Sequence, residues 1–289
     1  MSHSRLVKGE GDAGLFGPGS ITWRIHAHPS MLIGGLRSLL VQALDPLTMA
    51  GVAQHSNYKD DPWRRLMGTT DYVMTTTYGD TVAAKKSVAK VKAIHDRITG
   101  VDSVTGLPYS ANDPQLLLWV HNAEVDSFLA AYRAFGPRIS EDDADRYVAE
   151  MARLAELFGV PSDDIPRSVA ALNEYMDNKE ITITEAAKDT MRFILYPPVP
   201  WWGGKLPDVP GGKLLLIPGR AGWSVYSLAT LAILPRRLRR AYGLPWVPLT
   251  PMLKASVFAL SRTMRRLFPP PATVQNAMER QRELESGAA

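Results

Sequence analysis

The sequence predicts an all-α protein. Apolar residues recur at helical spacing through most of the 289 residues, whereas strand-like alternation is nearly absent. Capping residues stand where the periodic stretches begin, and glycines stand where several of them end. Hydrophobic residues make up 45% of the chain and charged residues 21%, which is the composition of an ordinary globular protein. A chain of this length and composition can bury a sizeable core.

Ten helices are expected, with bounds uncertain by a few residues. Asp113 is expected to cap one of them with Pro114 in its first turn, Ser140 should cap the next, and Gly159 should end that helix. A stretch rich in Pro, Gly and Trp, 196–219, is expected to be an ordered connector to a smaller C-terminal group. The expected helices are 29–44, 62–76, 80–99, 113–135, 140–158, 166–178, 184–195, 222–241, 248–267 and 271–285.

The ends of the chain and its charge limit the function classes. Residues 1–20 are polar and rich in glycine, are expected to be flexible, and lack a secretory signal, so a cytoplasmic location is expected. The two most apolar windows are shorter than the roughly 20 residues that span a bilayer. The net charge is +4, but residues 213–289 carry 12 Lys and Arg against three Glu. This basic C-terminal part is either a solvated surface or a contact for a membrane or for phosphates.

Several kinds of chemistry are excluded by missing residues. The chain has no cysteine, which excludes disulfides, Cys-ligated zinc, iron–sulfur clusters and thiolate-ligated haem. It also has no H-E-x-x-H, no E-x-x-H, no G-x-S-x-G and no G-K-S/T motif. The sequence therefore does not support a hydrolase or a nucleotide-dependent enzyme.

Two of the six histidines lie on apolar helix faces. His95 follows Val88 and Val91 on a stripe expected to include Ile94 and Ile98, and His121 occupies a similar place in the next helix. A buried core histidine with satisfied nitrogens is the more common explanation for each. The alternative is a non-covalently bound b-type haem, which needs one neutral imidazole and cations for its propionates. The expected cations are Arg64, Arg65 and Arg97. His26 and His28 form an H-x-H pair that would share a face only on a strand.

The chain resembles a known family in six stretches that occur in the same order and at similar spacing. It is similar to the MpaB and rubber-oxygenase (latex clearing protein) catalytic domain family, also called DUF2236, over about residues 14–268. The stretches are DPLTMAGVAQHS (45–56), DPWRRLMGTTDYVMTTTYGD (61–80), VKAIHDRITG (91–100), GLPYSANDPQLLLWVHNAEVDSFLAAYRAFG (106–136), ELFGVPSDDIPRSVAAL (156–172) and AILPRRLRRAYGLPW (232–246).

The resemblance implies a globin-like helical core with additional C-terminal helices, forming one haem-binding domain at 21–268 and followed by a C-terminal helix and tail at 269–289. It implies haem b and oxidative cleavage of carbon–carbon double bonds with O2. His95 is expected to be the iron ligand, with His121 in reserve. Arg65 and Thr69 match catalytic residues on the distal side, and Gly68 replaces a distal lysine, so the sixth coordination position is expected to be open or water-filled.

Two further departures weaken the match to the rubber enzymes. Asp45-Pro46 stands in place of a usual His-Pro, and no acidic counterpart of a proposed catalytic base occurs near Met49. The expected function is a haem-dependent oxygenase acting with O2 on a hydrophobic molecule, such as an isoprenoid or an unsaturated lipid. The alternatives are a haem-binding sensor without turnover, and a helical scaffold whose basic face binds membrane or nucleic acid. For the oxygenase, no nucleic-acid partner is expected, and the basic C-terminal face allows peripheral membrane contact.

Overall fold

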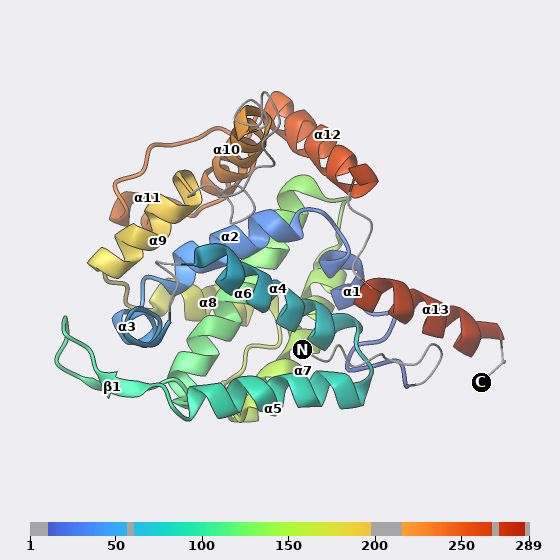
Figure 1. Cartoon of the computed structure of the whole chain (residues 1–289), viewed down its shortest axis with the longest axis horizontal. Coiled ribbons are helices and arrows are strands. Elements are labelled where there is room, and N and C mark those ends of the chain that lie inside the picture. The colour runs from blue at the N-terminus through green and yellow to red at the C-terminus, as the bar shows by residue number, and fades with distance from the viewer. Residues whose placement is uncertain (1–10, 57–60, 198–215, 268–271, 287–289) are drawn as a thin grey trace, which may run out of the picture.

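The all-α prediction is confirmed by a computed structural model, which describes residues 11–56, 61–197, 216–267 and 272–286 (Figure 1). The only strands among these residues form a small antiparallel hairpin, β1 (Thr99–Val101) and β2 (Pro108–Ser110). The helices are α1 (Ile21–His26), α2 (Met31–Gln42), α3 (Pro46–His55), α4 (Pro62–Tyr78), α5 (Thr81–His95), α6 (Pro114–Phe135), α7 (Glu141–Phe158), α8 (Val169–Asn178), α9 (Glu185–Leu195), α10 (Leu216–Ala232), α11 (Arg236–Ala241), α12 (Pro251–Leu267) and α13 (Ala272–Ser286), with a 3-10 turn at Ser162–Asp164.

Helix α6 lies at the centre of the molecule and packs closely on α2. The close approach depends on Gly34, where a Cβ atom would stand only 2.7 Å from the Phe128 ring and 3.0 Å from its Cα atom. Beside this contact, the buried Arg37 donates to Asp126 at 2.6 Å and to Ser127 at 2.7 Å. The α2–α6 seam is therefore tightly packed and its charges are paired.

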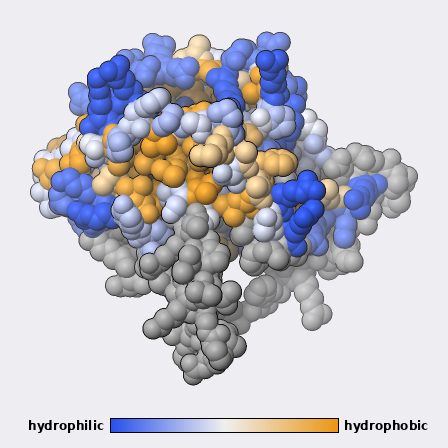
Figure 2. Space-filling model, turned by 90° about the horizontal axis from the view of Figure 1, so that it is seen from above, coloured by the Kyte–Doolittle hydropathy of each residue, from blue (hydrophilic) through white to orange (hydrophobic). Residues whose placement is uncertain are grey.

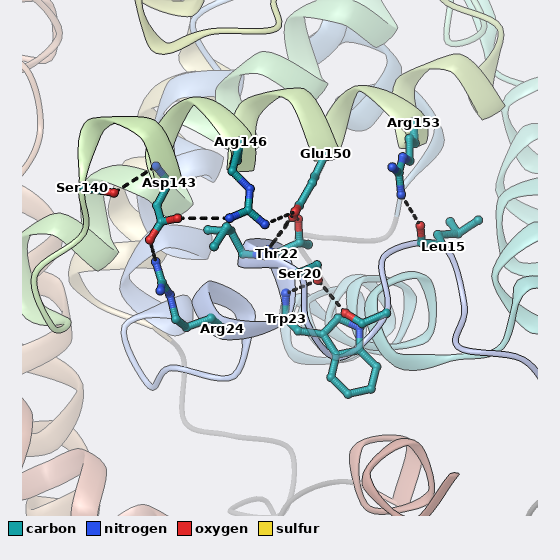
Figure 3. A network of polar contacts seen from close by, with 12 residues as sticks. Leu15, Ser20, Thr22, Trp23, Arg24, Ser140, Asp143, Arg146, Glu150 and Arg153 are labelled. Atoms are coloured by element: carbon teal, nitrogen blue, oxygen red, sulfur yellow. Dashed lines mark hydrogen bonds and ion pairs between the residues drawn. The ribbon is translucent and has the colours of Figure 1, made fainter. Parts of the chain in front are cut away.

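A polar network joins the N-terminal segment and α1 to α7 (Figure 3). Glu150 accepts a hydrogen bond from the Thr22 amide at 2.9 Å and another from its hydroxyl at 2.8 Å. Arg153 donates to the carbonyl oxygen of Leu15 at 2.9 Å. Leu15 and Phe16 also pack against the core beneath α7. Residues 11–20, expected to be flexible, thus make specific contacts, while residues 1–10 lie outside the described residues.

Local sequence signals set most helix ends as expected. The side chains of Asp113 and Ser140 accept hydrogen bonds from amides of the helices that they precede, α6 and α7. Gly159 ends α7 with a φ of 95°, a conformation that glycine adopts without strain. Asp45 and its neighbour Pro46 likewise begin α3.

Some expected elements were wrong. The helix expected at 222–241 is two helices, α10 and α11, because Pro235 has no amide hydrogen and stands at the start of the second. The expected helices include none with the bounds of α1 or α3. The hairpin was not predicted either. Most of the expected connector 196–219 lies outside the described residues, and the expected C-terminal helix corresponds to α13.

Helices α4 and α5 lie close together where the chain turns between them, and they diverge toward α3 and β1 (Figure 1). The diverging ends are the first half of α4 and the last turns of α5. Most residues from 64 to 71 are exposed, including Met67 at 59%, although the second half of α4 is buried. The first half of α4 is therefore covered far less than the second.

Candidate functional site

Helix α5 carries His95 at its C-terminal end. His95 is half-buried, whereas Ile94, expected on the same stripe, is 50% exposed. The helix turns by about 100° per residue, so adjacent side chains point in different directions. The inward stripe consists of Ala84, Val88, Val91, His95 and Ile98.

The surroundings of His95 favour a neutral ring with a defined tautomer. Its buried Nδ1 atom and the Oδ1 atom of Asn112 both lack a hydrogen bond among the described residues, and they are complementary as donor and acceptor. The Asn112 amide is fixed by a 2.6 Å hydrogen bond to Asp96. Burial lowers the pKa of His95, the charge of Arg65 lowers it further, and Asn112 raises it. A neutral ring protonated at Nδ1 presents Nε2 as a lone-pair donor.

Arg65, Thr69 and Tyr72 lie on one side of α4, because they are four and three residues apart. The Thr69 hydroxyl donates to the backbone carbonyl of Arg65 at 3.1 Å, so its proton is used within the helix. Arg65 is exposed to solvent, and yet desolvation lowers its pKa. An exposed side chain whose pKa is lowered by desolvation is expected where protein atoms surround the Arg65 guanidinium without covering it.

Phe158, the last residue of α7, connects this side of α4 with α5. Its ring centroid lies 6.1 Å from that of Tyr72 and 6.2 Å from that of His95. Because Arg65 also acts on the pKa of His95, the inward side of α4 and the end of α5 face the same space.

The sequence analysis missed a carboxyl group on α6 whose charge acts on Tyr72. Glu124 is half-buried, and burial raises its pKa to about 7, while a hydrogen bond from Gln42 of α2 lowers it. No cationic side chain of the described residues contributes to that pKa. After the larger effect of burial, the charge of Glu124 raises the pKa of Tyr72 on α4 and of Tyr147 on α7. Its spacing of three residues from the inward His121 was the signal that could have identified it.

We refer to the region around Arg65 and Tyr72 of α4, His95 of α5 and Glu124 of α6 as the α4–α6 recess, because Arg65 acts on the pKa of His95 and Glu124 acts on that of Tyr72. Gly68 also lies on the poorly covered half of α4, and a Cβ atom there would meet no heavy atom within 4 Å. The space at this position therefore admits a Cβ atom, and glycine at position 68 is not forced by packing.

The other histidines have different surroundings. His121 is 8% exposed, and burial lowers its pKa to about 4. His26 is also buried, with its two ring nitrogens 2.8 Å from the Thr77 hydroxyl and 3.0 Å from the Tyr147 hydroxyl. The neighbouring His28 lies 2.9 Å from the Ser30 hydroxyl. No group of three or more His, Asp or Glu side chains that could hold a metal ion occurs in the described part of the chain.

Arg64 and Arg97, the expected partners of haem propionates, are both exposed. Arg64 lies in the first turn of α4, and Arg97 lies in the turn that follows α5. These are the ends at which α4 and α5 diverge (Figure 1). The structure thus brings Arg65 and His95 together and leaves Arg64 and Arg97 at the surface nearby.

The C-terminal helices present apolar and basic side chains to solvent. Seen from above, the molecule shows a broad apolar area with hydrophilic side chains at its edge (Figure 2). Trp246 and Phe258 are 70% and 61% exposed. Not every arginine of this region is available to a partner, because Arg237 donates to the backbone carbonyls of Met176, Asp177 and Lys179 at the C-terminal end of α8. Among the described residues, no helix is long and apolar enough to cross a membrane.

Comparison with known proteins gives one match. The family model described as "ER-bound oxygenase mpaB/B'/Rubber oxygenase, catalytic domain" matches residues 23–267. No curated protein and no solved structure matches the chain. The match covers most of the chain, including every residue of the α4–α6 recess. The chain therefore belongs to the family of mpaB and rubber-oxygenase catalytic domains.

Proposed function

We propose that this protein is a haem b-dependent oxygenase that oxidises an unsaturated hydrophobic molecule with O2, by cleavage of a carbon–carbon double bond or a related oxidation. Membership of an oxygenase family supports the reaction class. The observation that carries the haem proposal is the pair of unpartnered, complementary atoms, Nδ1 of His95 and Oδ1 of Asn112. A hydrogen bond between them would orient the ring for ligation through Nε2.

The residues of the recess fit a haem with one protein ligand. His95 would hold the iron, and His121 is the reserve candidate. Arg64 and Arg97 are the candidates to bind the propionates, since their exposed side chains can reach outward from the diverging ends of α4 and α5. A bound haem would supply the iron that activates O2.

The chain's own groups would prepare the substrate and stabilise charge. Arg65 can donate hydrogen bonds to an oxygen atom on which negative charge develops, and its partly desolvated position strengthens such bonds. Thr69 would accept a hydrogen bond rather than donate one, because its proton is bonded to Arg65. Tyr72 and Phe158 offer apolar ring surface to an unsaturated chain.

The absorbance spectrum of the purified protein tests the proposal. With haem supplied during expression, we expect a Soret band that His95→Ala abolishes or shifts more than His121→Ala does. Asn112→Leu should shift the band or lower haem affinity roughly 10-fold. A colourless protein would refute the haem proposal, and a larger effect of His121→Ala would make His121 the ligand.

Oxygen consumption separates an oxygenase from a haem-binding sensor. The proposed enzyme should consume O2 when it is given an unsaturated isoprenoid or lipid, and Arg65→Ala should slow that consumption about 100-fold. A protein with a normal spectrum and no consumption with any alkene would instead be a sensor.

We also propose peripheral contact with an anionic membrane as the source of the hydrophobic substrate. The exposed Trp246 and Phe258 and the exposed Arg236 and Arg240 of α11 support it. The protein should co-sediment with vesicles containing phosphatidylserine, and 0.5 M salt should release it. Equal sedimentation with neutral vesicles would contradict a role for the arginines.

A further inference from the structure

Helix α5 presents a basic face to solvent. Its 15 residues, Thr81–His95, include four lysines and no aspartate or glutamate. Lys85, Lys86 and Lys90 are exposed, and no ion pair among the described residues involves them. The first carboxylate after the helix, Asp96, accepts a hydrogen bond from Asn112 at 2.6 Å. These three lysines therefore have no ionic role in holding the fold together, and their charges are available to an anionic partner.

Apolar side chains continue this face beyond the lysines. Ile94, near the end of α5, is 50% exposed, and the hairpin that follows exposes Val101 by 59%, Val104 by 58% and Leu107 by 54%. Figure 1 shows the hairpin extending from the end of α5 beyond the helices. We refer to the three lysines, Ile94 and the three exposed hairpin side chains as the α5–hairpin edge. Exposed apolar side chains beside a row of unpaired cations are typical of a surface that binds another macromolecule.

The position of the α5–hairpin edge favours a soluble protein over a membrane. Helices α11 and α12, which carry side chains proposed for membrane contact, lie in the upper part of Figure 1, whereas α5 lies along its lower edge. With the C-terminal helices on a bilayer, the α5–hairpin edge points away from it. Lysines steer an acidic protein toward this edge, and the exposed apolar side chains can form the centre of the contact.

The same helix carries His95, the proposed iron ligand. Lys86 and His95 lie on opposite sides of α5, because nine residues turn a helix by about 900°. A helix with its side chains is only about 10 Å across, so a carrier docked on the lysines would stand one helix away from His95. Haem iron binds O2 in its ferrous form, and a ferric resting form therefore needs one electron.

We propose that the α5–hairpin edge docks an acidic electron-carrier protein of the ferredoxin kind. The carrier would lose one electron and the iron held by His95 would gain it, passing from ferric to ferrous, and no bond would form or break. This inference rests on the proposed function, because it names a partner for the same site.

Binding of a plant-type [2Fe–2S] ferredoxin, measured by surface plasmon resonance, tests the proposal. The wild-type protein should bind it at low ionic strength, and high ionic strength should weaken binding about 10-fold because salt screens exposed charges. Lys86→Glu combined with Lys90→Glu should weaken binding about 10-fold and should slow reduction of the haem by ferredoxin in stopped-flow absorbance. Lys254→Glu combined with Arg262→Glu on α12 makes the same change in net charge elsewhere and should stay within about twofold of wild type.

The hairpin provides a second, independent pair of substitutions. Val104→Ser combined with Leu107→Ser removes apolar contact area at side chains that are more than half exposed, so thermal unfolding should not change. Ferredoxin should then dissociate about threefold faster. If the lysine variant does not fold, this pair decides, and an unchanged dissociation rate would overturn the inference.

The remaining outcomes separate this inference from the haem proposal. No salt-sensitive binding by a protein with a Soret band, or equal losses in the α5 and α12 variants, overturns the inference alone. Anionic vesicles that bind the wild type but not the lysine variant, with ferredoxin binding unchanged, would make the edge a membrane contact and also overturn it. A colourless protein that binds ferredoxin through Lys86 and Lys90 refutes the haem proposal and leaves the docking surface standing.

Discussion

Helix α6 has one tightly packed side and one open side. On the α2–α6 seam, Asp126 is paired with the buried Arg37, and Gly34 brings the two backbones close together. Two residues earlier, Glu124 faces the α4–α6 recess without a cationic partner. Both residues are carboxylates on one helix, so their chemistry depends on what packs against each side. The seam stabilises the fold, whereas no cationic side chain of the described residues acts on Glu124.

The largest expected effect comes from removing the buried charge of the seam. Arg37→Met should lower the free energy of unfolding by about 3 kcal/mol, because Asp126 loses its partner while it stays largely buried. The matched control is Arg133→Met, since Arg133 pairs with Glu141 at an exposed site and should contribute less than about 1 kcal/mol. Urea denaturation measures both variants. Equal losses would mean that the seam is no more sensitive than the surface.

Gly34 and Gly35 test how closely α2 approaches α6. Gly34→Ala should destabilise the protein by about 2 kcal/mol, because the added methyl group would overlap Phe128. Gly35→Ala adds the same methyl group where nothing lies within 4 Å, so it should stabilise α2 by about 0.5 kcal/mol. Thermal unfolding should give shifts of opposite sign, and shifts of the same sign would contradict the close approach.

Acid should destabilise the protein through its buried histidines. Burial lowers the pKa of His26 to about 3 and of His121 to about 4, so between pH 4.5 and 6.5 the unfolded chain binds more protons at these sites. Glu124 acts in the opposite direction, because its raised pKa of about 7 makes the folded state bind the extra proton. The two histidines outweigh one carboxyl, and stability should fall by about 1 kcal/mol per pH unit on average over this range on acidification.

Glu124→Gln sharpens this pH experiment by removing the opposing group. The slope of stability against pH should then roughly double between pH 4.5 and 6.5. Urea denaturation at three pH values measures it. Stability that rises on acidification in the wild type would contradict the assignment of neutral buried histidines.

A small effect on stability is expected at Gly68 in the recess. Gly68→Ala should stabilise α4 by about 0.5 kcal/mol, because no atom stands in the way of the added Cβ. Gly68→Lys should fold equally well and, if haem is bound, should change the absorbance spectrum to that of a six-coordinate iron. A lysine variant that loses stability by several kcal/mol would show that this part of α4 is packed.

The sequence by itself determined most of the helices, many of their ends and the family. Caps such as Asp113, Ser140 and Gly159 act within a few residues of themselves, so their effect can be predicted from the neighbouring residues alone. Pro235 also acts locally, since it separates α10 from α11, but the prediction placed one continuous helix there. The inward position of His95 also follows from a periodicity that is visible in the sequence.

Only the tertiary structure decided which side chains meet. Asn112 lies at the end of α5, where it contacts Asp96 and acts on the pKa of His95, because the hairpin returns the chain from α5 to α6. Glu124 and Asp126 have the same chemistry in the sequence, and only the packing of α2, α4 and α7 against α6 separates a paired carboxylate from one left without a cation. The physical reason is that local rules act over three or four residues, whereas desolvation and charge pairing depend on helices that are distant in sequence.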